Sequence, residues 1–558
     1  MSEITKYDKD MVRMMKDPVK WVKAHLTSDD PKDKGARWYQ EQILRHPHNR
    51  IALRCGRRIG KCIEENQRIM MPDGSYQRIK DLVEKGESGF EVASLDKDLK
   101  QTTSEVVHIQ DNGFKPTYKL TTQRGNEVIL TGNHPVLTID GWVEVDDIEK
   151  GEYIATPKSM PRFGTKDSRS DSYIRLLAHL IATGKFKKDG TVCIKINDKQ
   201  LVPIIQSACI SQGIQMLKST TTSYNLIYQV DNPIMNLFRS TYGSIPQEVF
   251  TYSKEKLSLF IASFFDAKGW IATGSKYEVG TGSKSKSFLR DLSHLLLRFG
   301  ITPNIMTRKA HGNPYFQMLF YRVPAIKAFE KNFFPYSARQ DYFAPVFDYS
   351  KMKDKGGNKV PKGKLFEEER KRKNVKGNFT KKIPTVQEST LQTLAEEYNS
   401  KIFHDLATSD IYYDQVISKE YMGERQTYDV SVPETHNLVV EDIFVHNTWT
   451  MIAHMLWVAF TCNAGKNPKG STCLVATPYD SQARLIFDEI LTHVDNSESL
   501  RESIESKTKN PYYIKFKNGS VIKLFTAGTK SGSSGGSMRG QRSDWLYMDK
   551  TLSLPIAR

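Results

Sequence analysis

Cysteine and long apolar stretches are both scarce in this chain. Its 558 residues include six cysteines, which lie far apart and form no CxxC pair. This spacing argues against a disulfide framework and against a cysteine-based zinc site. The longest strongly apolar run, residues 451–462, is too short to span a bilayer, and the charged N-terminus has no apolar signal-peptide core. We therefore expect a cytoplasmic protein that is not secreted and has no membrane segment.

Acidic residues are outnumbered by basic ones. The chain contains 81 lysines and arginines against 64 aspartates and glutamates, which gives a formal net charge of +17. This excess favours a polyanionic partner, of which double-stranded DNA is the simplest. Hydrophobic residues make up 39% of the chain and aromatic residues 10%, which allows packed cores and argues against wholesale disorder. The length predicts about three or four domains.

A phosphate-binding loop starts in the first part of the chain and then breaks off. Residues 51–53 predict a short strand that leads into a glycine-containing basic loop ending at Lys61. A P-loop requires a serine or threonine directly after this lysine and then a helix, but Cys62 and several strand-like segments follow instead. The missing continuation is at Thr448, which begins an apolar helical pattern extending to Phe460. Joining Lys61 to Thr448 restores a strand, a phosphate loop and a helix in the correct order.

The intervening residues, 62–447, have ends that suit their own removal. The Cys62 thiol can attack the preceding carbonyl and convert the amide bond between Lys61 and Cys62 into a thioester. The Thr448 hydroxyl can then attack this thioester, and the side-chain amide of Asn447 can cyclise onto its own carbonyl and release the insertion. The resulting ester rearranges to a peptide bond between Lys61 and Thr448, so no cofactor is needed. An ordinary insertion between domains is the competing interpretation, but a loop that holds phosphate cannot tolerate such a long interruption.

Three sequence blocks near the ends of the insertion carry a resemblance to a known family. The blocks are CIEENQRIMMPDGSYQRIKDL, LTGNHPVLT and YDVSVPETHNLVVEDIFVHN. They resemble the N-terminal and C-terminal blocks of inteins, which are self-splicing elements with the all-β Hedgehog/intein (Hint) fold. By this resemblance Thr131 orients the first scissile amide, and His134 polarises or protonates it. The resemblance also implies that Asp429 assists the thioester and branching steps and that His436 and His446 assist asparagine cyclisation.

The resemblance divides the chain into five segments. The flanking segments are 1–61 and 448–558, the two halves of the splicing domain are 62–156 and 385–447, and a nested module occupies 157–384. A lysine-rich stretch within this module, 351–382, suits either contacts to DNA phosphates or a solvated tether.

The nested module contains two apolar helical segments, which end at Gly184 and Gly269. The pair resembles the signature helices of LAGLIDADG (DOD-type) homing endonucleases, α+β proteins in which these helices join two DNA-gripping halves. In that family an acidic residue before each glycine holds a divalent metal ion, but here Thr183 and Lys268 occupy these positions. The resemblance implies binding of double-stranded DNA with lost or weakened cleavage, and Mg²⁺ for any activity that remains. The alternative is a pair of helices that serve only to pack a core.

The two flanking segments together resemble the ATPase domain of the large terminase subunit, the motor that packages DNA into the heads of tailed phages. The resemblance places Gln40 beside the adenine of ATP. It places these loop residues around the phosphates: Gly56, Arg57, Arg58, Gly60 and Lys61. It also implies that Thr448 and Asp549, the latter at the end of a Walker B strand, hold Mg²⁺. A terminase small subunit and a portal protein are the partners that it implies.

Two features of the flanks depart from the terminase pattern. Lys550 follows the Walker B aspartate where a catalytic glutamate is expected, and the chain ends soon afterwards at Arg558. We therefore expect nucleotide binding after splicing, but no ATP hydrolysis. The competing interpretation is a helicase-like or other DNA-binding P-loop ATPase whose insertion does not splice. The expected architecture is multidomain, with an all-β splicing domain, an α+β endonuclease-like domain and a split α/β P-loop domain.

Overall fold

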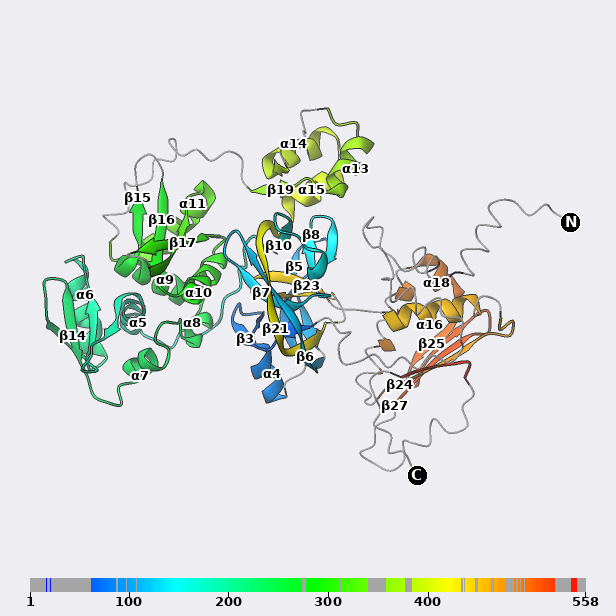
Figure 1. Cartoon of the computed structure of the whole chain (residues 1–558), viewed down its shortest axis with the longest axis horizontal. Helices are drawn as coiled ribbons and strands as arrows, with labels where there is room; N and C mark the ends of the chain where they lie inside the picture. The colour runs from blue at the N-terminus through cyan, green and yellow to red at the C-terminus, as the bar shows by residue number, and fades with distance from the viewer. Residues whose placement is uncertain are drawn as a thin grey trace, which may run out of the picture. The chain divides into compact units, whose positions relative to one another are not determined.

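Two compact units make up the chain in the computed structural model (Figure 1): one comprises Gly60–His446, and the other Met1–Ile59 with Asn447–Arg558. The structure describes Asp17, Trp21 and residues 62–339, 358–376, 384–446, 450–526 and 543–548, with internal gaps of one to five residues. Among these residues, no helix is long and apolar enough to cross a membrane. Each boundary between the units lies within two residues of an expected splice junction.

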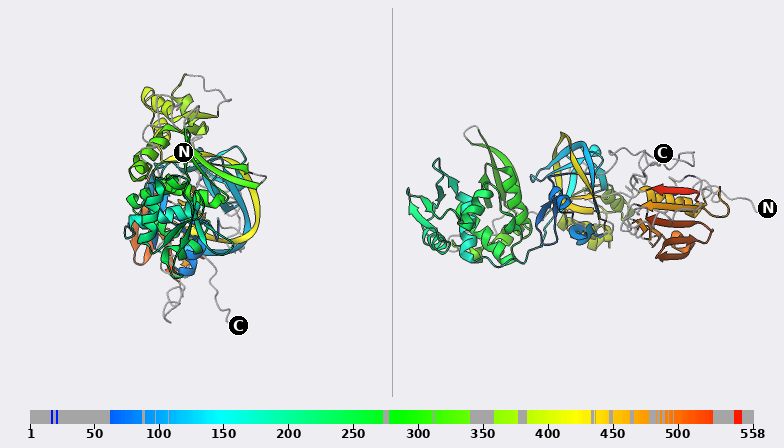
Figure 2. Two further views of the ribbon diagram at one scale, coloured as in Figure 1. Left: turned by 90° about the vertical axis from the view of Figure 1, so that its left-hand side faces the viewer. Right: turned by 90° about the horizontal axis from the view of Figure 1, so that it is seen from below.

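Strands from both ends of the insertion form a single antiparallel sheet. Its order is β1-β7-β6-β21-β10-β8-β23-β22-β2-β3, and β9 pairs with β8. Figures 1 and 2 show the yellow strands of the C-terminal half lying among the blue and cyan strands of the N-terminal half. The strands are β1 (Ile63–Glu64), β2 (Arg68–Met70), β3 (Tyr76–Arg78), β6 (His108–Thr122), β7 (Glu127–Thr131), β8 (Pro135–Thr138), β9 (Gly141–Glu144), β10 (Tyr153–Pro157), β21 (Ile411–Ser431), β22 (Asn437–Val440) and β23 (Ile443–His446).

The long strand β21 unites the two halves of this sheet. It pairs with β6 from Val416 opposite Thr122 to Ser431 opposite His108, and it also pairs with β10 and β1. Both ends of β21 are rich in β-branched and aromatic residues, which suit a half-buried pleated surface, whereas its middle is polar and more exposed. Three irregularities in the register with β6 bend the pair of strands. The expected sheet-rich splicing domain is confirmed.

Short elements complete the N-terminal half of the splicing domain. They are the helix α4 (Ile79–Lys85), the hairpin of β4 (Phe90–Leu95) and β5 (Gln101–Val106), and the 3-10 turn η1 (Val145–Asp147). Helix α4 ends because Gly86 adopts a left-handed conformation with φ of 66°, and its N–H bonds to the carbonyls of Leu82 and Val83.

The nested module is built from two similar halves, each a helix followed by a four-stranded sheet. Helices α5 (Asp171–Thr183) and α9 (Lys254–Lys268) pack against each other. The first sheet has the order β11 (Lys185–Phe186), β12 (Val192–Lys195), β14 (Ser223–Ile227), β13 (Gln215–Lys218). The second has the matching order β15 (Trp270–Ala272), β16 (Glu278–Ser283), β18 (Asn313–Phe320), β17 (Asn304–Ala310). This duplication accounts for the paired apolar helices in the sequence.

Both helices end at the expected glycines, but not through a left-handed cap. Gly184 and Gly269 are extended, with φ of −63° and −75°. A Cβ atom at Gly184 would lie 2.4 Å from the carbonyl oxygen of Leu180, and one at Gly269 would lie 2.5 Å from the ring of Phe265. Glycine is therefore required at both positions for lack of space rather than for backbone freedom.

Further helices surround these sheets and a small subdomain follows them. The helices of the nested module are α6 (Leu201–Ser211), α7 (Pro233–Ser240), α8 (Gln247–Phe250), α10 (Lys286–Leu297), α11 (Val323–Phe333) and η2 (Phe334–Tyr336). The subdomain contains β19 (Lys359–Pro361), α13 (Lys364–Arg372), β20 (Thr385–Gln387), α14 (Glu388–Glu397) and α15 (Lys401–Thr408). Strand β19 pairs with β20, and the ring centres of Phe366 in α13 and Phe403 in α15 lie 5.5 Å apart. The expected boundary between 384 and 385 therefore falls inside a folded subdomain, and part of the basic stretch 351–382 is a packed helix.

The flanking unit has a sheet of mixed direction. Strand β24 (Thr472–Thr477) is parallel to both β27 (Val521–Thr526) and β28 (Trp545–Met548), while β25 (Ile504–Lys509), β26 (Tyr512–Phe516) and β27 are antiparallel. Helix α16 (Thr450–Thr461) follows the expected start at 448, and α18 (Glu498–Ser503) precedes β25. Strands β26 and β27 form a hairpin that turns at Asn518-Gly519, with Gly519 at φ of 83°. Trp21 packs 5.4 Å from Phe460 of α16, so residues from both flanks share one core.

A buried histidine in α5 makes the stability of the nested module dependent on pH. His179 is 2% exposed, and burial lowers its pKa from 6.5 to about 4. The neutral form is favoured in the folded state, so only the unfolded chain takes up this proton between pH 6.5 and about 4. Stability is therefore lost as the pH falls through this window, by at most about 3 kcal/mol.

This dependence can be measured by urea unfolding at pH 7 and pH 5, with hydrogen exchange of the α5 amides identifying the relevant transition. We expect His179→Gln to reduce the loss of stability between the two pH values. The matched control is His404→Gln, because His404 has a side chain that is 65% exposed. An unchanged pH dependence in His179→Gln would contradict the assignment.

Candidate active site

Two backbone pairings place Cys62 between distant strands. Ile63, the next residue, lies opposite Leu130 of β7 on one side and Tyr428 of β21 on the other. In an antiparallel register this sets Cys62 beside the residues that follow Leu130 and Tyr428, which are Thr131 and Asp429. Cys62 itself is fully buried. The sheet thus gathers two expected site residues beside Cys62.

Thr131 and His134 both contact the backbone of Cys62. The Cys62 N–H donates to Thr131 Oγ1 at 3.0 Å, and the Thr131 N–H donates to the Cys62 carbonyl at 3.0 Å. His134 Nδ1 lies 3.2 Å from the same carbonyl oxygen. The amide nitrogen of Cys62 belongs to the expected scissile bond, so Thr131 contacts that bond directly. His134 instead contacts the carbonyl one residue further on, and the carbonyl of Lys61 lies outside the described residues.

The chain folds locally so that these two side chains face Cys62. Strand β7 ends at Thr131, and a tight turn follows in which the His134 N–H donates to the Thr131 carbonyl at 3.0 Å. A Cβ atom at Gly132 would lie 2.1 Å from a carboxylate oxygen of Asp146. A larger residue in this turn would therefore displace the Asp146 side chain.

A lysine and an asparagine that the motifs did not indicate contact the cysteine sulfur. Lys115 Nζ lies 2.8 Å from Cys62 Sγ, and Asn112 Nδ2 lies 3.0 Å from it. Lys115 is 2% exposed although lysine is rarely buried without a partner. Both residues come from β6, which pairs with β21 beside β1. A lysine in a strand normally indicates an exposed position, so the sequence carries no local signal of this contact.

Burial and charge act in opposite directions on the Cys62 thiol. Burial raises its pKa above 9.0, and the negative charge of Asp429 adds to the rise. The charge and hydrogen bond of Lys115 and the hydrogen bond of Asn112 lower it. Burial prevails, so the thiol is largely protonated at neutral pH and must lose its proton during attack. The arrangement combines a nucleophile, a nearby carboxylate and a cation that stabilises the thiolate.

The described end of the insertion returns to the same region of the sheet. Strand β23 ends at His446, which lies opposite Asn437 of β22. Val445 pairs with Val136 of β8, the strand that begins directly after His134. The backbone of His446 is therefore close in register to the turn that carries His134.

Asn437 is a further buried residue of this region that sequence reasoning missed. Its Oδ1 accepts from the Leu95 N–H at 2.8 Å, and its Nδ2 donates to the Leu95 carbonyl at 2.9 Å. Ser94 Oγ also donates to Asn437 Oδ1 at 3.0 Å. These bonds attach the start of β22 to β4, and they stabilise the hairpin that ends at His446.

Several expected site residues lie outside the described part of the chain. They are Gln40, Gly56, Arg57, Arg58, Gly60, Lys61, His436, Asn447, Thr448 and Asp549, together with the side chain of His446. The expected ATP and Mg²⁺ site falls entirely among them.

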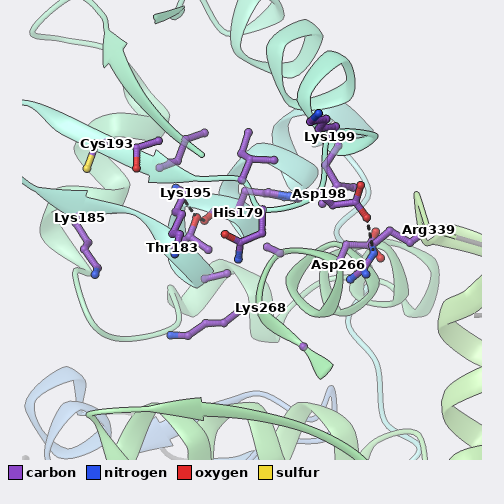
Figure 3. A pocket seen from close by; sticks show the side chains of 18 residues that line it. His179, Thr183, Lys185, Cys193, Lys195, Asp198, Lys199, Asp266, Lys268 and Arg339 are labelled. Atoms are coloured by element: carbon purple, nitrogen blue, oxygen red, sulfur yellow. Dashed lines mark hydrogen bonds and ion pairs between the residues drawn. The ribbon is translucent and has the colours of Figure 1, made fainter. Parts of the chain in front are cut away.

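The ends of α5 and α9 line a hollow of about 850 Å³ in the nested module (Figure 3). Thr183 Oγ1 donates to the His179 carbonyl at 3.1 Å and accepts from the Lys195 N–H at 3.3 Å. Lys268 also lines the hollow, and burial together with Lys185 lowers its pKa. Figure 3 shows the labelled lysines around this space.

The neighbouring carboxylate is engaged elsewhere. Asp266 accepts from Ser337 Oγ at 2.5 Å and from the Ala338 N–H at 2.8 Å, and it is 4% exposed. No cluster of three or more histidine, cysteine, aspartate or glutamate side chains suited to a metal ion occurs in the described ranges. Thr183 and Lys268 do not suit a divalent metal ion. The Thr183 hydroxyl is already hydrogen-bonded to backbone groups, and Lys268 is a cation.

Comparison with known proteins agrees with the geometry of the splicing site. A family model described as the intein splicing domain matches residues 69–447, and the chain therefore belongs to the family of proteins that contain this domain. The replicative DNA helicase DnaB of Rhodothermus marinus is 24% identical over 433 residues, covering 69% of this chain and 46% of the helicase. The chain spans about half the length of the curated relatives it matches.

Solved structures with lower similarity include two of different kinds. A DnaB intein from Synechocystis sp. PCC 6803 is 12% identical, covers 70% of this chain and 99% of its own, and has a TM-score of 0.24. I-DmoI in complex with DNA and Mn is 16% identical, covers 29% of this chain and 95% of its own, and has a TM-score of 0.23. Both TM-scores are below 0.5, and no conclusion rests on them.

The contact between Lys115 and Cys62 predicts a role in the upstream step. Lys115→Met removes the cation that lowers the thiol pKa, so less thiolate forms at neutral pH. A hydrogen bond to a charged group contributes about 1.5–3 kcal/mol, which corresponds to a loss of about tenfold to a hundredfold in rate. The measurement is cleavage at the upstream junction by dithiothreitol in an Asn447→Ala background, at pH 7 and pH 9.

The matched control is Lys119→Met on the same strand. Lys119 forms a partly exposed ion pair with Glu420 at 2.8 Å. We expect this variant to cleave at the normal rate, and we expect Lys115→Met to recover partly at pH 9. Equal rates in the two variants at pH 7 would exclude the role of Lys115.

Proposed function

We propose that residues 62–447 excise themselves and join Lys61 to Thr448. The observation that carries this proposal is the hydrogen bond of 3.0 Å between the amide nitrogen of Cys62 and Thr131, beside a thiol that Lys115 contacts at 2.8 Å. The membership in the intein splicing-domain family supports it. The return of β23 to the turn that carries His134 supports a single site for both junctions.

In the first step the Cys62 sulfur attacks the carbonyl of Lys61, and the bond from that carbonyl to the Cys62 nitrogen breaks. The thiol gives up its proton, the nitrogen gains one and leaves as an amine, and a thioester forms. Thr131 holds the leaving nitrogen, and Asp429 takes the thiol proton. Lys115 stabilises the thiolate during the transfer.

The remaining steps proceed without any external reactant. The Thr448 hydroxyl attacks the thioester and releases the Cys62 thiol, which produces a branched ester. The side-chain nitrogen of Asn447 attacks its own backbone carbonyl, breaks the bond to Thr448 and leaves a C-terminal succinimide on the insertion. His436 and His446 assist this cyclisation as acid and base. The freed amine of Thr448 then attacks the ester and forms the peptide bond to Lys61.

The joined flanks form a P-loop ATPase, and we infer that it is the ATPase domain of a phage terminase large subunit. The parallel strand β24 between β27 and β28, with α16 directly after 448, supports an α/β nucleotide-binding fold. The residues proposed to bind ATP are Gln40 and the loop that ends at Lys61, and those proposed to hold Mg²⁺ are Thr448 and Asp549. Double-stranded DNA, a small subunit and a portal protein are the proposed partners.

A helicase-like ATPase is the alternative host, since one relative is a replicative DNA helicase. Its match covers 69% of this chain, which is about the share that residues 62–447 occupy, so we infer that it reflects the insertion rather than the flanks. A binding assay with portal rings separates the two hosts, because a terminase domain binds them and a helicase does not.

The nested module binds double-stranded DNA without cutting it efficiently. Five basic side chains line the hollow at the helix ends: Lys185, Lys195, Lys199, Lys268 and Arg339. They suit a phosphate backbone, whereas Thr183 and Lys268 do not suit a metal ion.

The splicing proposal predicts two products. Expression of the chain should yield a free insertion with Cys62 and Asn447 as its ends and a joined protein in which Lys61 is bonded to Thr448. Cys62→Ala should stop upstream cleavage and ligation, and Asn447→Ala should stop release at the downstream junction. Intact-mass spectrometry checks these outcomes. Persistence of the full-length chain under reducing conditions at neutral pH would refute the proposal.

The DNA proposal predicts binding that weakens with salt. The probe is a duplex of the uninterrupted host gene that spans the codons for Lys61 and Thr448. Replacing both Lys185 and Lys195 with alanine should reduce the slope of log affinity against log salt by about one for each phosphate that is no longer neutralised. Lys256→Ala is the control, since Lys256 pairs with Asp171 at 2.8 Å on the same module. Efficient double-strand cleavage with Mg²⁺ would overturn this assignment.

A further inference from the structure

The turn between β22 and β23 has a left-handed backbone conformation, which is strained for residues other than glycine. Val440 pairs with Ile443, and the two residues between them, Glu441 and Asp442, have φ of 49° and 60°. Positive φ at both central positions is the feature of a type I′ turn, in which Asn-Gly is preferred because other side chains are strained. Contacts from outside the hairpin must therefore hold this turn.

Those contacts come in part from helix α10 of the nested module. Arg290 Nη2 donates to Glu441 Oε2 at 2.8 Å, and His294 Nδ1 lies 3.0 Å from Asp442 Oδ1. Arg290 and His294 are four residues apart, so they lie on one face of the helix. Arg68 of β2 completes the set, with its Nε donating to Glu441 Oε1 at 2.9 Å.

Both carboxylates in the turn are buried and charged. Glu441 is 6% exposed and Asp442 is 8% exposed. Burial alone would raise their pKa values, but Arg68 and Arg290 beside Glu441, and His294 beside Asp442, hold both pKa values below the ordinary range. A buried carboxylate that loses such a partner is strongly destabilised.

Helix α10 is itself fixed to the splicing domain. Arg290 Nη2 also donates to the backbone carbonyl of Glu127 in β7 at 2.9 Å, and Asp291 pairs with Arg68 at 2.6 Å. Phe444 of β23 and Leu292 of α10 belong to the same apolar core. The helix therefore bridges the strand beside Cys62 and the hairpin that leads to the downstream junction.

The geometry of the turn determines where the downstream junction lies. The turn sets the register that places His446 opposite Asn437, and β23 in turn pairs with β8 through Val445. In a hairpin the register follows from the turn, and a shift by one residue moves every side chain to the other face. Such a shift would carry His446, and the residue bonded to it, away from the site.

We propose that helix α10 of the nested module positions the downstream splice junction by holding the strained turn between β22 and β23. The inference rests on the proposed splicing function and deepens it. Arg290 and His294 are positioning residues that act through the hairpin, since they contact Glu441 and Asp442 in its turn. Through these two residues the nested module supports asparagine cyclisation.

The test measures the two cleavages separately in the full chain. Upstream cleavage by dithiothreitol is followed in an Asn447→Ala background, and spontaneous downstream cleavage in a Cys62→Ala background. Arg290→Ala and His294→Ala should each slow downstream cleavage by about tenfold or more. Upstream cleavage should stay within about twofold of the parent in His294→Ala, because His294 bonds to Asp442 and to the Gly74 carbonyl rather than to β7. Lys256→Ala, which removes an ion pair elsewhere on the module, should change neither rate.

A second variant separates positioning from general loss of folding. Glu441→Asn with Asp442→Gly supplies a turn that adopts positive φ without help. Added to Arg290→Ala, it should restore downstream cleavage to within about threefold of the parent. An unchanged downstream rate in Arg290→Ala, or a failure of the new turn to restore a slowed one, would overturn the proposal. Absence of cleavage at both junctions of the parent chain would instead refute splicing itself.

Discussion

The pairing of strand β1 with two partners is the constraint on which the splicing site depends. Ile63 lies between Leu130 and Tyr428, so Cys62 is held between a strand from each half of the insertion. The long pairing of β21 with β6 holds those halves together. A one-residue shift in either pairing would turn the neighbouring side chains to the opposite face of the sheet. The position of the nucleophile is therefore a property of the whole sheet.

Buried charge is balanced wherever the structure places it near the splicing chemistry. Lys115 is buried beside the Cys62 sulfur, on which the charge of Asp429 also acts. Glu441 is buried between Arg68 and Arg290. Low-dielectric surroundings strengthen such contacts and penalise their loss, so the site is held rigidly. The hollow of the nested module differs, because five basic side chains and only two carboxylates line it.

The nested module and the splicing domain are packed together through a common apolar core. One apolar core contains Met70 and Leu95 from the splicing domain and Leu296 from the nested module. A backbone hydrogen bond also crosses between them, from the Ile305 N–H to the Arg124 carbonyl at 3.1 Å. Removal of residues 157–384 would therefore expose part of the core of the splicing domain.

The sequence by itself determined the features that follow from covalent order. Cys62 after Lys61, and Asn447 before Thr448, define the reacting groups because the chemistry joins neighbours in the chain. Repeated helices ending in glycine were also predictable, although lack of space, and not a left-handed cap, proved to be the reason.

Only the tertiary structure decided which side chains surround the nucleophile. Lys115 and Asn112 contact Cys62 across about fifty residues of sequence, and Arg290 contacts Glu441 across about 150. No local pattern marks a strand lysine as buried or a helix arginine as the support of a distant turn. These contacts depend on strand register and on the packing of α10 against the sheet, which long-range pairing fixes and short motifs do not encode.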